Sequence, residues 1–251
     1  MTTLAGARIW VVGASSGIGA ALARELVGRG ASVAVSARRA GELEKVAGSS
    51  MMPVVADVTD RAAVAAAWAD VRDRLGGVET VVFNAGYWEQ MAARQWDADV
   101  FARHVNVNLL GLSNLLAAVL PDLVTNGGRI VCVASVAGYR GLAGAEGYGA
   151  TKAAQINLME SLRATLRGTD VDLVTVCPGF VRTPMTRQNR FPMPFMVEAE
   201  EAARAICDGL ERGRPEIVFP LPMAVLMKTA RLLPVRVWAA LSGRAARGVD
   251  Q

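Results

Sequence analysis

Histidine, cysteine and aromatic residues are scarce in this sequence, which has one histidine and three cysteines in 251 residues and an aromatic content of 6%. Cys132, Cys177 and Cys207 are odd in number and widely separated, and two of them fall inside apolar runs. Cysteines of this kind are usually buried, unreactive thiols. We therefore expect a reducing compartment and no metal site, and we interpret the single histidine, His104, as structural or exposed.

A basic leader and long uncharged apolar runs are also missing. The first apolar run, residues 9–23, is interrupted by glycines and serines and follows no basic segment, so we expect no signal peptide. No other apolar run has the length and lack of charge of a membrane span. These absences favour a cytoplasmic protein.

The residues that are present indicate one globular domain, since apolar residues make up 52% of the chain, charged residues 20%, and 25 glycines are spread along it. Short β-rich runs alternate with longer helical patterns, the longest over residues 98–124, 148–167 and 198–212. Apolar strands separated by helices imply a parallel sheet with both faces covered. The sequence thus predicts a doubly wound α/β fold that binds a ligand at the carboxyl ends of its strands. The seven expected strands are RIWVV, SVAVSA, PVVA, ETVVF, RIVCVAS, VDLVTV and EIVF.

A glycine-rich turn, VVGASSGIG, follows the first expected strand and opens the next helix. Glycine permits unusual backbone angles and close approach of a pyrophosphate, and a helix N-terminus offers free N–H groups to an anion. The alternative is a tight turn with no ligand. We predict that the turn binds a dinucleotide through Gly13, Ser15, Ser16, Gly17, Ile18 and Gly19.

The end of the second expected strand carries two arginines and no acid. A fold of this kind that prefers NAD commonly has an acid there to hold the ribose hydroxyls. Arg38 and Arg39 stand where a 2′-phosphate would lie, so NADP(H) is predicted over NAD(H), unless the two arginines are simply solvated. After the third strand, Asp57 and Val58 are placed to hold the adenine, although capping of the next helix is an equally good use of part of this segment.

Seven short segments occur in an order that resembles the short-chain dehydrogenase/reductase family: VGASSGIG, DVTD, FNAG, NVNLLG, VASVAG, YGATK and PGFVRTP. The resemblance covers about residues 5–219. It implies a Rossmann-type seven-stranded sheet in one domain over residues 1–219, with residues 220–251 as a helical extension. Val12 stands where the family often has threonine, and Phe83 replaces the first asparagine of the usual Asn-Asn-Ala-Gly. Both replaced groups are supporting ones, so the resemblance implies an intact active site.

The resemblance places the family's catalytic set on Asn108, Ser135, Tyr148 and Lys152. Tyr148 and Lys152 are four residues apart on one expected helix, and a cation beside a tyrosine can lower its pKa by roughly 1–3 pH units. Ser135 can donate a hydrogen bond to a carbonyl oxygen that gains negative charge. Asn108 lies inside a long expected helix, where it could position the water through which Lys152 is reprotonated.

Two further segments fit a nicotinamide cofactor. FNAG is expected to bring backbone close to the adenosine ribose, and PGFVRTP resembles the family's motif on the nicotinamide side. Plain turns explain their glycines and proline as well. Lys152 can also donate to the nicotinamide ribose hydroxyls. The cofactor residues that these segments add are Asn84, Ala85, Gly86, Tyr148, Lys152, Pro178, Gly179, Val181 and Thr183.

Residues 184–201 are too irregular for a strand and rich in methionine, phenylalanine and proline. Phe191, Met193, Phe195 and Met196 suggest the lining of a pocket for an apolar or lipid-like carbonyl compound, or else they only pack this loop onto the sheet. The acidic run EAEE reads as the first turn of a helix and not as a metal site.

Residues 220–251 form a basic, amphipathic extension that could lie in a membrane interface, cover the substrate pocket or contact a neighbouring subunit. The resemblance implies a homodimer or homotetramer formed through the helices over 98–124 and 148–167. No recognition motif for nucleic acid accompanies the basic residues. These are Lys228, Arg231, Arg236, Arg244 and Arg247, against one acid, Asp250.

The sequence as a whole predicts an NADP(H)-dependent oxidoreductase that transfers hydride between nicotinamide and a carbonyl or secondary alcohol. Two alternatives are a non-catalytic NADP(H)-binding regulator and a membrane-surface interaction protein. The set of Ser135, Tyr148 and Lys152 argues against the regulator, because a binding protein has no evident need for it.

Overall fold

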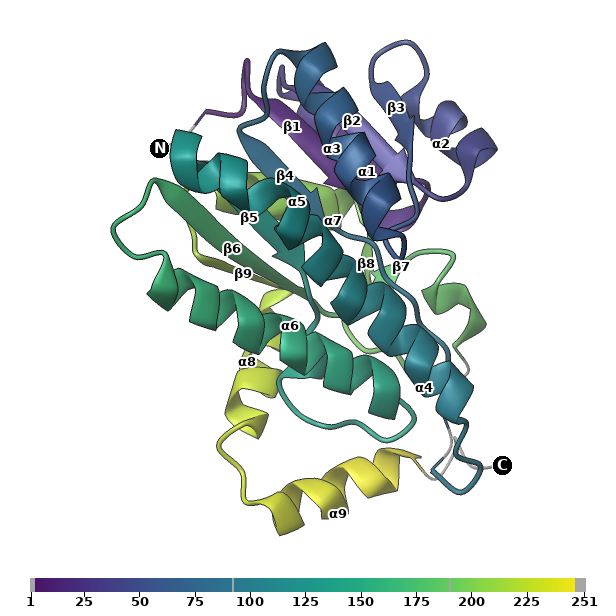
Figure 1. Cartoon of the computed structure of the whole chain (residues 1–251). Coiled ribbons are helices and arrows are strands. Elements are labelled where there is room, and N and C mark those ends of the chain that lie inside the picture. The colour runs from purple at the N-terminus through teal and green to yellow at the C-terminus, as the bar shows by residue number, and fades with distance from the viewer. Residues whose placement is uncertain (1–2, 92, 190, 247–251) are drawn as a thin grey trace.

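A seven-stranded, fully parallel sheet with helices on both faces forms the centre of the chain in the computed structural model (Figure 1). The structure describes residues 3–91, 93–189 and 191–246. The strand order is β3-β2-β1-β4-β5-β6-β9, so the predicted fold class is confirmed. The strands are β1 (Arg8–Val12), β2 (Ser32–Ala37), β3 (Met52–Val55), β4 (Thr80–Phe83), β5 (Gly128–Val133), β6 (Val171–Pro178) and β9 (Glu216–Phe219), and β7 (Val181–Arg182) and β8 (Val197–Glu198) pair separately.

The helices cover the two faces of the sheet in separate groups. They are α1 (Gly17–Gly28), α2 (Ala40–Ala47), α3 (Arg61–Leu75), α4 (Ala98–His104), α5 (Gly111–Asn126), α6 (Glu146–Thr165), α7 (Ala199–Glu211), α8 (Leu221–Ala230) and α9 (Val235–Ala246). Side chains of β1 alternate between the faces, with Ile9 packed among residues of α1 and α7 and Trp10 among residues of α3 and α5. The order reverses between β1 and β4, and a doubly wound sheet binds its ligand at such a point.

The helix expected over 98–124 is present from Ala98 to Asn126, but it is not α-helical throughout. A π-helical segment, Val105–Leu110, joins α4 to α5. Among the described residues this helix alone is long and apolar enough to cross a membrane, which core helices of globular proteins can also be. Leu112, Leu115 and Val119 of its inner face are fully buried in the core, so we interpret it as a core helix.

The C-terminal extension packs behind the loop that follows β5. Met223 and Met227 of α8 are buried there with Tyr139, whose hydroxyl donates to Glu216, as does the ammonium of Lys228. Trp238 Nε1 of α9 donates to the carbonyl of residue 141 at 2.7 Å. The division of the chain at residues 219 and 220 stays a prediction, and the predicted basic residue Arg247 and the acid Asp250 lie outside the described residues.

Candidate active site

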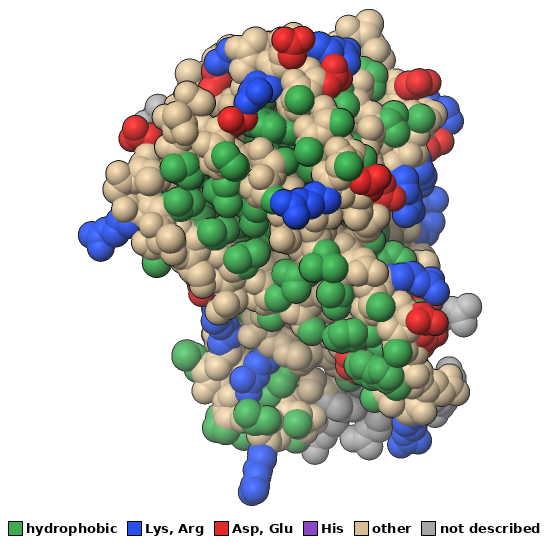
Figure 2. Space-filling view, in the orientation of Figure 1, with side chains coloured by type: hydrophobic (Ala, Val, Ile, Leu, Met, Phe, Trp, Pro, Cys, Tyr) green, Lys and Arg blue, Asp and Glu red, His purple; other side chains and the backbone are tan. Residues whose placement is uncertain are grey.

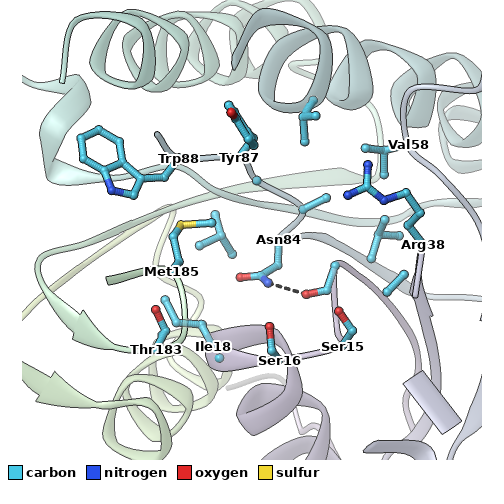
Figure 3. Close-up of a pocket in the computed structure, with 18 of the residues that line it drawn as sticks. Ser15, Ser16, Ile18, Arg38, Val58, Asn84, Tyr87, Trp88, Thr183 and Met185 are labelled. Atoms are coloured by element: carbon cyan, nitrogen blue, oxygen red, sulfur yellow. Dashed lines mark hydrogen bonds between the residues drawn. The ribbon is translucent and has the colours of Figure 1, made fainter. Parts of the chain in front are cut away.

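A cleft of about 1140 Å³ opens at the carboxyl edge of the sheet, between the loops that follow β1 to β6. In Figure 3, Arg38 lies toward one end of this cleft and Trp88 and Met185 toward the other, with Ser15 and Ser16 on one wall. Two predicted residues, Gly19 and Asn108, are absent from the lining. The predicted residues that do line it are Gly13, Ser15, Ser16, Gly17, Ile18, Arg38, Arg39, Asp57, Val58, Asn84, Ala85, Gly86, Ser135, Tyr148, Lys152, Pro178, Gly179, Val181 and Thr183.

The glycine-rich turn is held by close backbone packing. Gly13 has φ +91°, and a Cβ there would lie 2.3 Å from the backbone nitrogen of Ala85. A Cβ on Gly19 would lie 2.3 Å from the carbonyl oxygen of Gly13. That oxygen accepts a hydrogen bond from Asn84 Nδ2 at 2.8 Å. The missing side chain of Gly19 and the hydrogen bond from Asn84 therefore fix the conformation of the turn. The missing side chain of Gly13 lets the turn pack closely against the loop after β4.

Two arginines border the wall where the turn meets the end of β2. Arg39 Nη2 donates to Ser15 Oγ at 3.0 Å and to Ser16 Oγ at 3.3 Å. Arg38 Nη1 lies 3.7 Å from Asp57 Oδ2. Partial burial would raise the pKa of Asp57, but hydrogen bonds from Thr59 and the charge of Arg38 outweigh it and lower the pKa. The cation of Arg39 thus reaches over both serines of the turn.

The sequence left two roles open for the segment after β3, contact with the adenine and capping of α3. Asp57 and Asp60 differ in which of these roles their positions allow. Asp57 lines the cleft and accepts from Thr59. Asp60 Oδ1 accepts from the backbone nitrogens of Ala62 and Ala63 at 2.9 and 3.0 Å and so caps α3.

Tyr148 and Lys152 lie one turn apart on α6, with Lys152 Nζ 5.5 Å from the centre of the tyrosine ring. Ser135 ends the segment after β5, and its hydroxyl accepts from the backbone nitrogen of Ala137 at 3.1 Å. Burial raises the pKa of Tyr148 to about 12, against a smaller lowering by a hydrogen bond with Ser135. Burial lowers the pKa of Lys152 to about 8. The expectation that Lys152 lowers the pKa of Tyr148 is wrong for this structure, because loss of solvent dominates both groups.

The ammonium of Lys152 is directed into the protein as well as the cleft. Nζ donates to the carbonyl oxygen of Val133 at 2.9 Å and to Gln155 Oε1 at 3.0 Å. Gln155 is fully buried, and its Nε2 donates to the carbonyl oxygen of Asn108 at 2.6 Å. The sequence analysis missed Gln155, although a glutamine three residues after Lys152 in an otherwise apolar stretch was a signal that could have found it.

The side chain of Asn108 supports a loop and does not reach the cleft. Its Oδ1 accepts from the backbone nitrogen of Tyr87 at 2.7 Å, and its Nδ2 donates to Tyr87 O at 3.1 Å and Thr151 Oγ1 at 2.9 Å. Both N–H groups of the amide and its oxygen therefore bond to protein atoms. Asn108 connects the π-helical segment to the loop after β4 and to α6.

Comparison with known proteins identifies the family. The profile described as short chain dehydrogenase matches residues 7–193. The chain belongs to this family. It is 38% identical to an uncharacterized oxidoreductase of Myxococcus xanthus over 241 residues, covering 93% of this chain and 95% of that protein. The resemblance predicted from the motifs is confirmed: the chain is an NAD(P)-dependent short-chain dehydrogenase/reductase that acts on CH–OH or C=O groups.

Solved structures show the same fold with either nucleotide. A short-chain dehydrogenase from Burkholderia cenocepacia in complex with NADP has a TM-score of 0.85 and 28% identity, with 96% of this chain and 99% of that chain covered. A short-chain dehydrogenase/reductase from Burkholderia phymatum in complex with NAD has a TM-score of 0.84 over 91% of this chain and 94% of that chain. At 22% identity the second likeness shows the fold alone. These neighbours leave the nucleotide preference of this dehydrogenase open.

His104 is buried beneath the active site of this dehydrogenase and is not exposed. Its Nδ1 lies 2.9 Å from the carbonyl oxygen of Val100, and its Nε2 accepts from the backbone nitrogen of Glu89 at 3.2 Å. These partners assign the proton to Nδ1. Burial lowers its pKa, and its ring lies 6.5 Å from that of Tyr148. The structural interpretation fits, and the exposed alternative is wrong.

An aromatic side chain that the sequence analysis missed stands next to Tyr148. Trp88 meets the tyrosine ring edge to face at 5.3 Å, and its Nε1 donates to Asn189 Oδ1 at 2.8 Å. Trp88 thereby connects the loop after β4 to the irregular segment. Its signal was its position two residues after the FNAG motif.

The irregular segment contributes to the cleft through residues other than those expected. Pro184, Met185, Thr186 and Gln188 line it. Of the two interpretations of the four later apolar residues, a pocket lining is wrong, since Phe191, Met193, Phe195 and Met196 do not line the cleft. Phe191 packs against Phe180 at 6.1 Å between ring centres, while Phe195 is half exposed.

The described residues contain no cluster of histidine, cysteine or acidic side chains that could hold a metal ion. The EAEE run begins α7, with Glu200 and Glu201 in its first turn and Glu198 paired with Arg182.

Proposed function

We propose that this dehydrogenase is an NADP(H)-dependent reductase of apolar carbonyl compounds. The observation that carries the proposal is the arrangement of one cleft, with Tyr148, Ser135 and Lys152 at one end and Arg38 and Arg39 at the other. A hydride donor and a phosphate-bearing nucleotide tail can bind such a cleft together.

The residues of the cleft fit a nicotinamide dinucleotide. The start of α1, at Gly17, presents backbone N–H groups next to the hydroxyls of Ser15 and Ser16, which suits a pyrophosphate. Asp57 and Val58 border the adenine end, and the 84–86 segment borders the adenosine ribose. On the nicotinamide side, Pro178, Gly179, Val181 and Thr183 form one wall.

The bound cofactor supplies the hydride, and the protein residues manage the charge that develops on the carbonyl oxygen. Tyr148 donates the proton, for which its neutral form is needed, and a pKa of about 12 keeps it neutral at physiological pH. Ser135 holds the same oxygen by a hydrogen bond. Lys152 has three N–H donors, two of which are used within the protein, so one remains for a hydroxyl in the cleft.

Selection of NADP(H) rests on Arg39 and Arg38. A guanidinium binds phosphate oxygens with both charge and directed hydrogen bonds, and neither arginine is buried. At the end of β2 the side chains available to a 2′-substituent are therefore cationic.

The apolar substrate class rests on the walls beside Tyr148. Trp88, which packs against Tyr148, and Met185 lie toward one end of the cleft, and Tyr87 lies between them and Arg38 (Figure 3). Flat aromatic and flexible thioether side chains bind bulky apolar groups without fixing one shape.

The test is oxidation of NADPH and of NADH by the purified protein with ketones and aldehydes of increasing size and apolarity. Turnover with NADPH should be lost in Tyr148→Phe. The matched control is Tyr139→Phe, whose hydroxyl bonds to Glu216 outside the cleft and whose loss should leave turnover in place. Absence of turnover with every carbonyl and alcohol, despite NADPH binding, would favour the regulator.

The C-terminal extension supports a second proposal, contact with an anionic membrane surface. Leu232, in the turn between α8 and α9, and Val235, the first residue of α9, are 84% and 73% exposed, and the basic residues Arg231 and Arg236 are their neighbours in the sequence. None of the described residues of the extension lines the cleft, which speaks against an active-site cover. We place such a protein in the cytoplasm, consistent with its three free, buried cysteines.

Sedimentation with anionic vesicles tests this contact. The double variant Leu232→Glu, Val235→Glu should lose binding, while Val55→Glu, a single change of the same kind at an exposed site on β3, should keep it. Equal sedimentation of the wild-type protein and both variants would contradict a membrane contact through the extension.

We also propose that the dehydrogenase is a homodimer or homotetramer through the face of α5 and α6. Figure 2, which looks onto these helices, shows hydrophobic side chains gathered there, and Leu110 and Val124 are 49% and 43% exposed. Sedimentation equilibrium measures the assembly, and a monomer at micromolar concentration would contradict it.

A further inference from the structure

Gln155 occupies the space between the ammonium of Lys152 and the π-helical segment. It lies on α6, three residues after Lys152, and is completely buried. Its amide spans from Lys152 Nζ, at 3.0 Å, to the carbonyl oxygen of Asn108, at 2.6 Å. From the sequence, a water molecule positioned by Asn108 is expected to reprotonate Lys152, whereas in the structure the Gln155 side chain lies between these two residues.

The orientation of the Gln155 amide is fixed by its partners. An ammonium only donates hydrogen bonds and a backbone carbonyl only accepts them. The reverse orientation would set the amide NH₂ against the ammonium and the amide oxygen against the carbonyl. The amide oxygen therefore faces Lys152, and its partial negative charge favours the protonated form of the lysine.

The surroundings of Lys152 offer no other charge that could take over this role. Tyr148 lies on the same helix, and the thiols of Cys132 on β5 and Cys177 on β6 are near enough to act on the charge of the ammonium. Burial raises the pKa of Cys132 to about 12 and of Cys177 to about 11, so both are neutral near pH 8. The more distant His104, whose pKa burial lowers, is neutral there too. Among the described residues Lys152 has no ion pair.

We propose that Gln155 is a positioning residue that holds Lys152 protonated and aimed at the cleft, and that it closes the route for protons between Lys152 and the π-helical segment. An amide can accept and donate hydrogen bonds here, but it does not exchange protons as a water molecule does. Lys152 therefore regains its proton from the cleft side. Only the expected effect on the rate of turnover rests on the proposed carbonyl reduction, because the protonation state of Lys152 can be measured without turnover.

The direct test is NMR titration of the free protein carrying lysine labelled with ¹³C at Cε. The chain has only three lysines, Lys45, Lys152 and Lys228, so the signals can be assigned with one Lys152→Arg variant. In wild-type protein the Lys152 midpoint is expected near pH 8. Gln155→Leu removes one of two acceptors and should lower the midpoint by about one pH unit, whereas Gln155→Glu should raise it by a similar amount.

The matched control is Asn157→Leu, which also replaces an amide by leucine on α6 but at an exposed position. It should leave the midpoint in place. An unchanged midpoint in Gln155→Leu refutes the positioning role. Should that variant fail to fold, Gln155→Glu decides in the same way.

A second experiment measures the rate of carbonyl reduction as a function of pH. The pH at which the rate falls on the alkaline side should shift with the Lys152 midpoint in each variant. Gln155→Ala leaves a polar gap that water can fill between Lys152 and Asn108. It should reduce kcat by less than the roughly tenfold loss expected for Gln155→Leu. Equal kcat in the Ala and Leu variants would refute the closed proton route. A wild-type protein without turnover would refute the proposed function and leave the titration to decide the positioning role.

Discussion

Replacement of Arg39 tests the proposed choice between NADPH and NADH most directly. Arg39 is exposed and spans both serines of the glycine-rich turn, with Nη2 at 3.0 Å from Ser15 Oγ and 3.3 Å from Ser16 Oγ. A 2′-phosphate at this place would receive charged hydrogen bonds from the guanidinium, and NADH has no group to receive them. Arg39→Ala should therefore weaken the binding of NADPH and leave the binding of NADH unchanged.

The size of the effect follows from the exposure of the arginine. A hydrogen bond to a charged group contributes about 1.5–3 kcal/mol, and solvent favours the lower end of this range. Since 1.4 kcal/mol corresponds to a factor of ten, kcat/KM for NADPH should fall about tenfold. Arg39→Asp, which adds an acid able to bind ribose hydroxyls, should reverse the preference. Raising the salt concentration to about 1 M shortens the screening length to about 3 Å and should shrink the wild-type preference.

Steady-state kinetics with both nucleotides at low and high salt measures these effects. Arg204→Ala, an exposed arginine on α7, is the control for a general loss of positive charge and should change neither value. An equal loss for NADPH and NADH in Arg39→Ala would refute the reasoning. It would mean that Arg39 acts by stiffening the turn through Ser15 and Ser16 and not by binding a phosphate.

Three further predictions concern the turn, the buried lysine and the aromatic wall. Gly13→Ala, with φ +91° and a Cβ 2.3 Å from the backbone nitrogen of Ala85, should lower the free energy of unfolding by about 3 kcal/mol in urea titrations, whereas Gly41→Ala, with open space around it, should not destabilise. Because the pKa of Lys152 falls from its usual 10.5 to about 8 on folding, its ammonium opposes folding at neutral pH, and wild-type protein should gain up to about 3 kcal/mol relative to Lys152→Met as pH rises from 8 to above 10. Parallel unfolding curves against pH would contradict this. Trp88→Ala should reduce kcat/KM for bulky apolar carbonyls about tenfold and for small ones less, and a uniform loss across the panel would instead assign the tryptophan to support of Tyr148.

The fold could be predicted because its signals are local and repeat along the chain. Strands such as RIWVV are apolar on both faces, and each is followed by a helical pattern, so the parallel sheet follows from the covalent order of the elements. Most cofactor residues could be predicted for the same reason, because they lie in short motifs at strand ends. The exact form of the helix from Ala98 to Asn126 could not, since its π-helical segment holds Asn108, whose partners Tyr87 and Thr151 are distant in sequence.

The unpredicted parts of the site are contacts between segments. Trp88 donates its N–H to Asn189, a hundred residues later in the chain. Gln155, on α6, donates to the carbonyl of Asn108, which lies in the π-helical segment. The composition of the irregular segment left two roles open for its apolar residues, lining the cleft or packing the loop onto the sheet. Composition cannot tell the side of a loop that faces a ligand from the side that faces Phe180 or solvent.

The charge state of Tyr148 shows why spacing alone does not determine chemistry. The YGATK motif correctly places a phenol and an ammonium one helical turn apart, and from that spacing a lowered tyrosine pKa was expected. Loss of solvent, however, opposes the charged form of either side chain, so it raises the pKa of Tyr148 and lowers that of Lys152. The carbonyl of Val133 and the amide of Gln155 then decide how much charge the lysine retains.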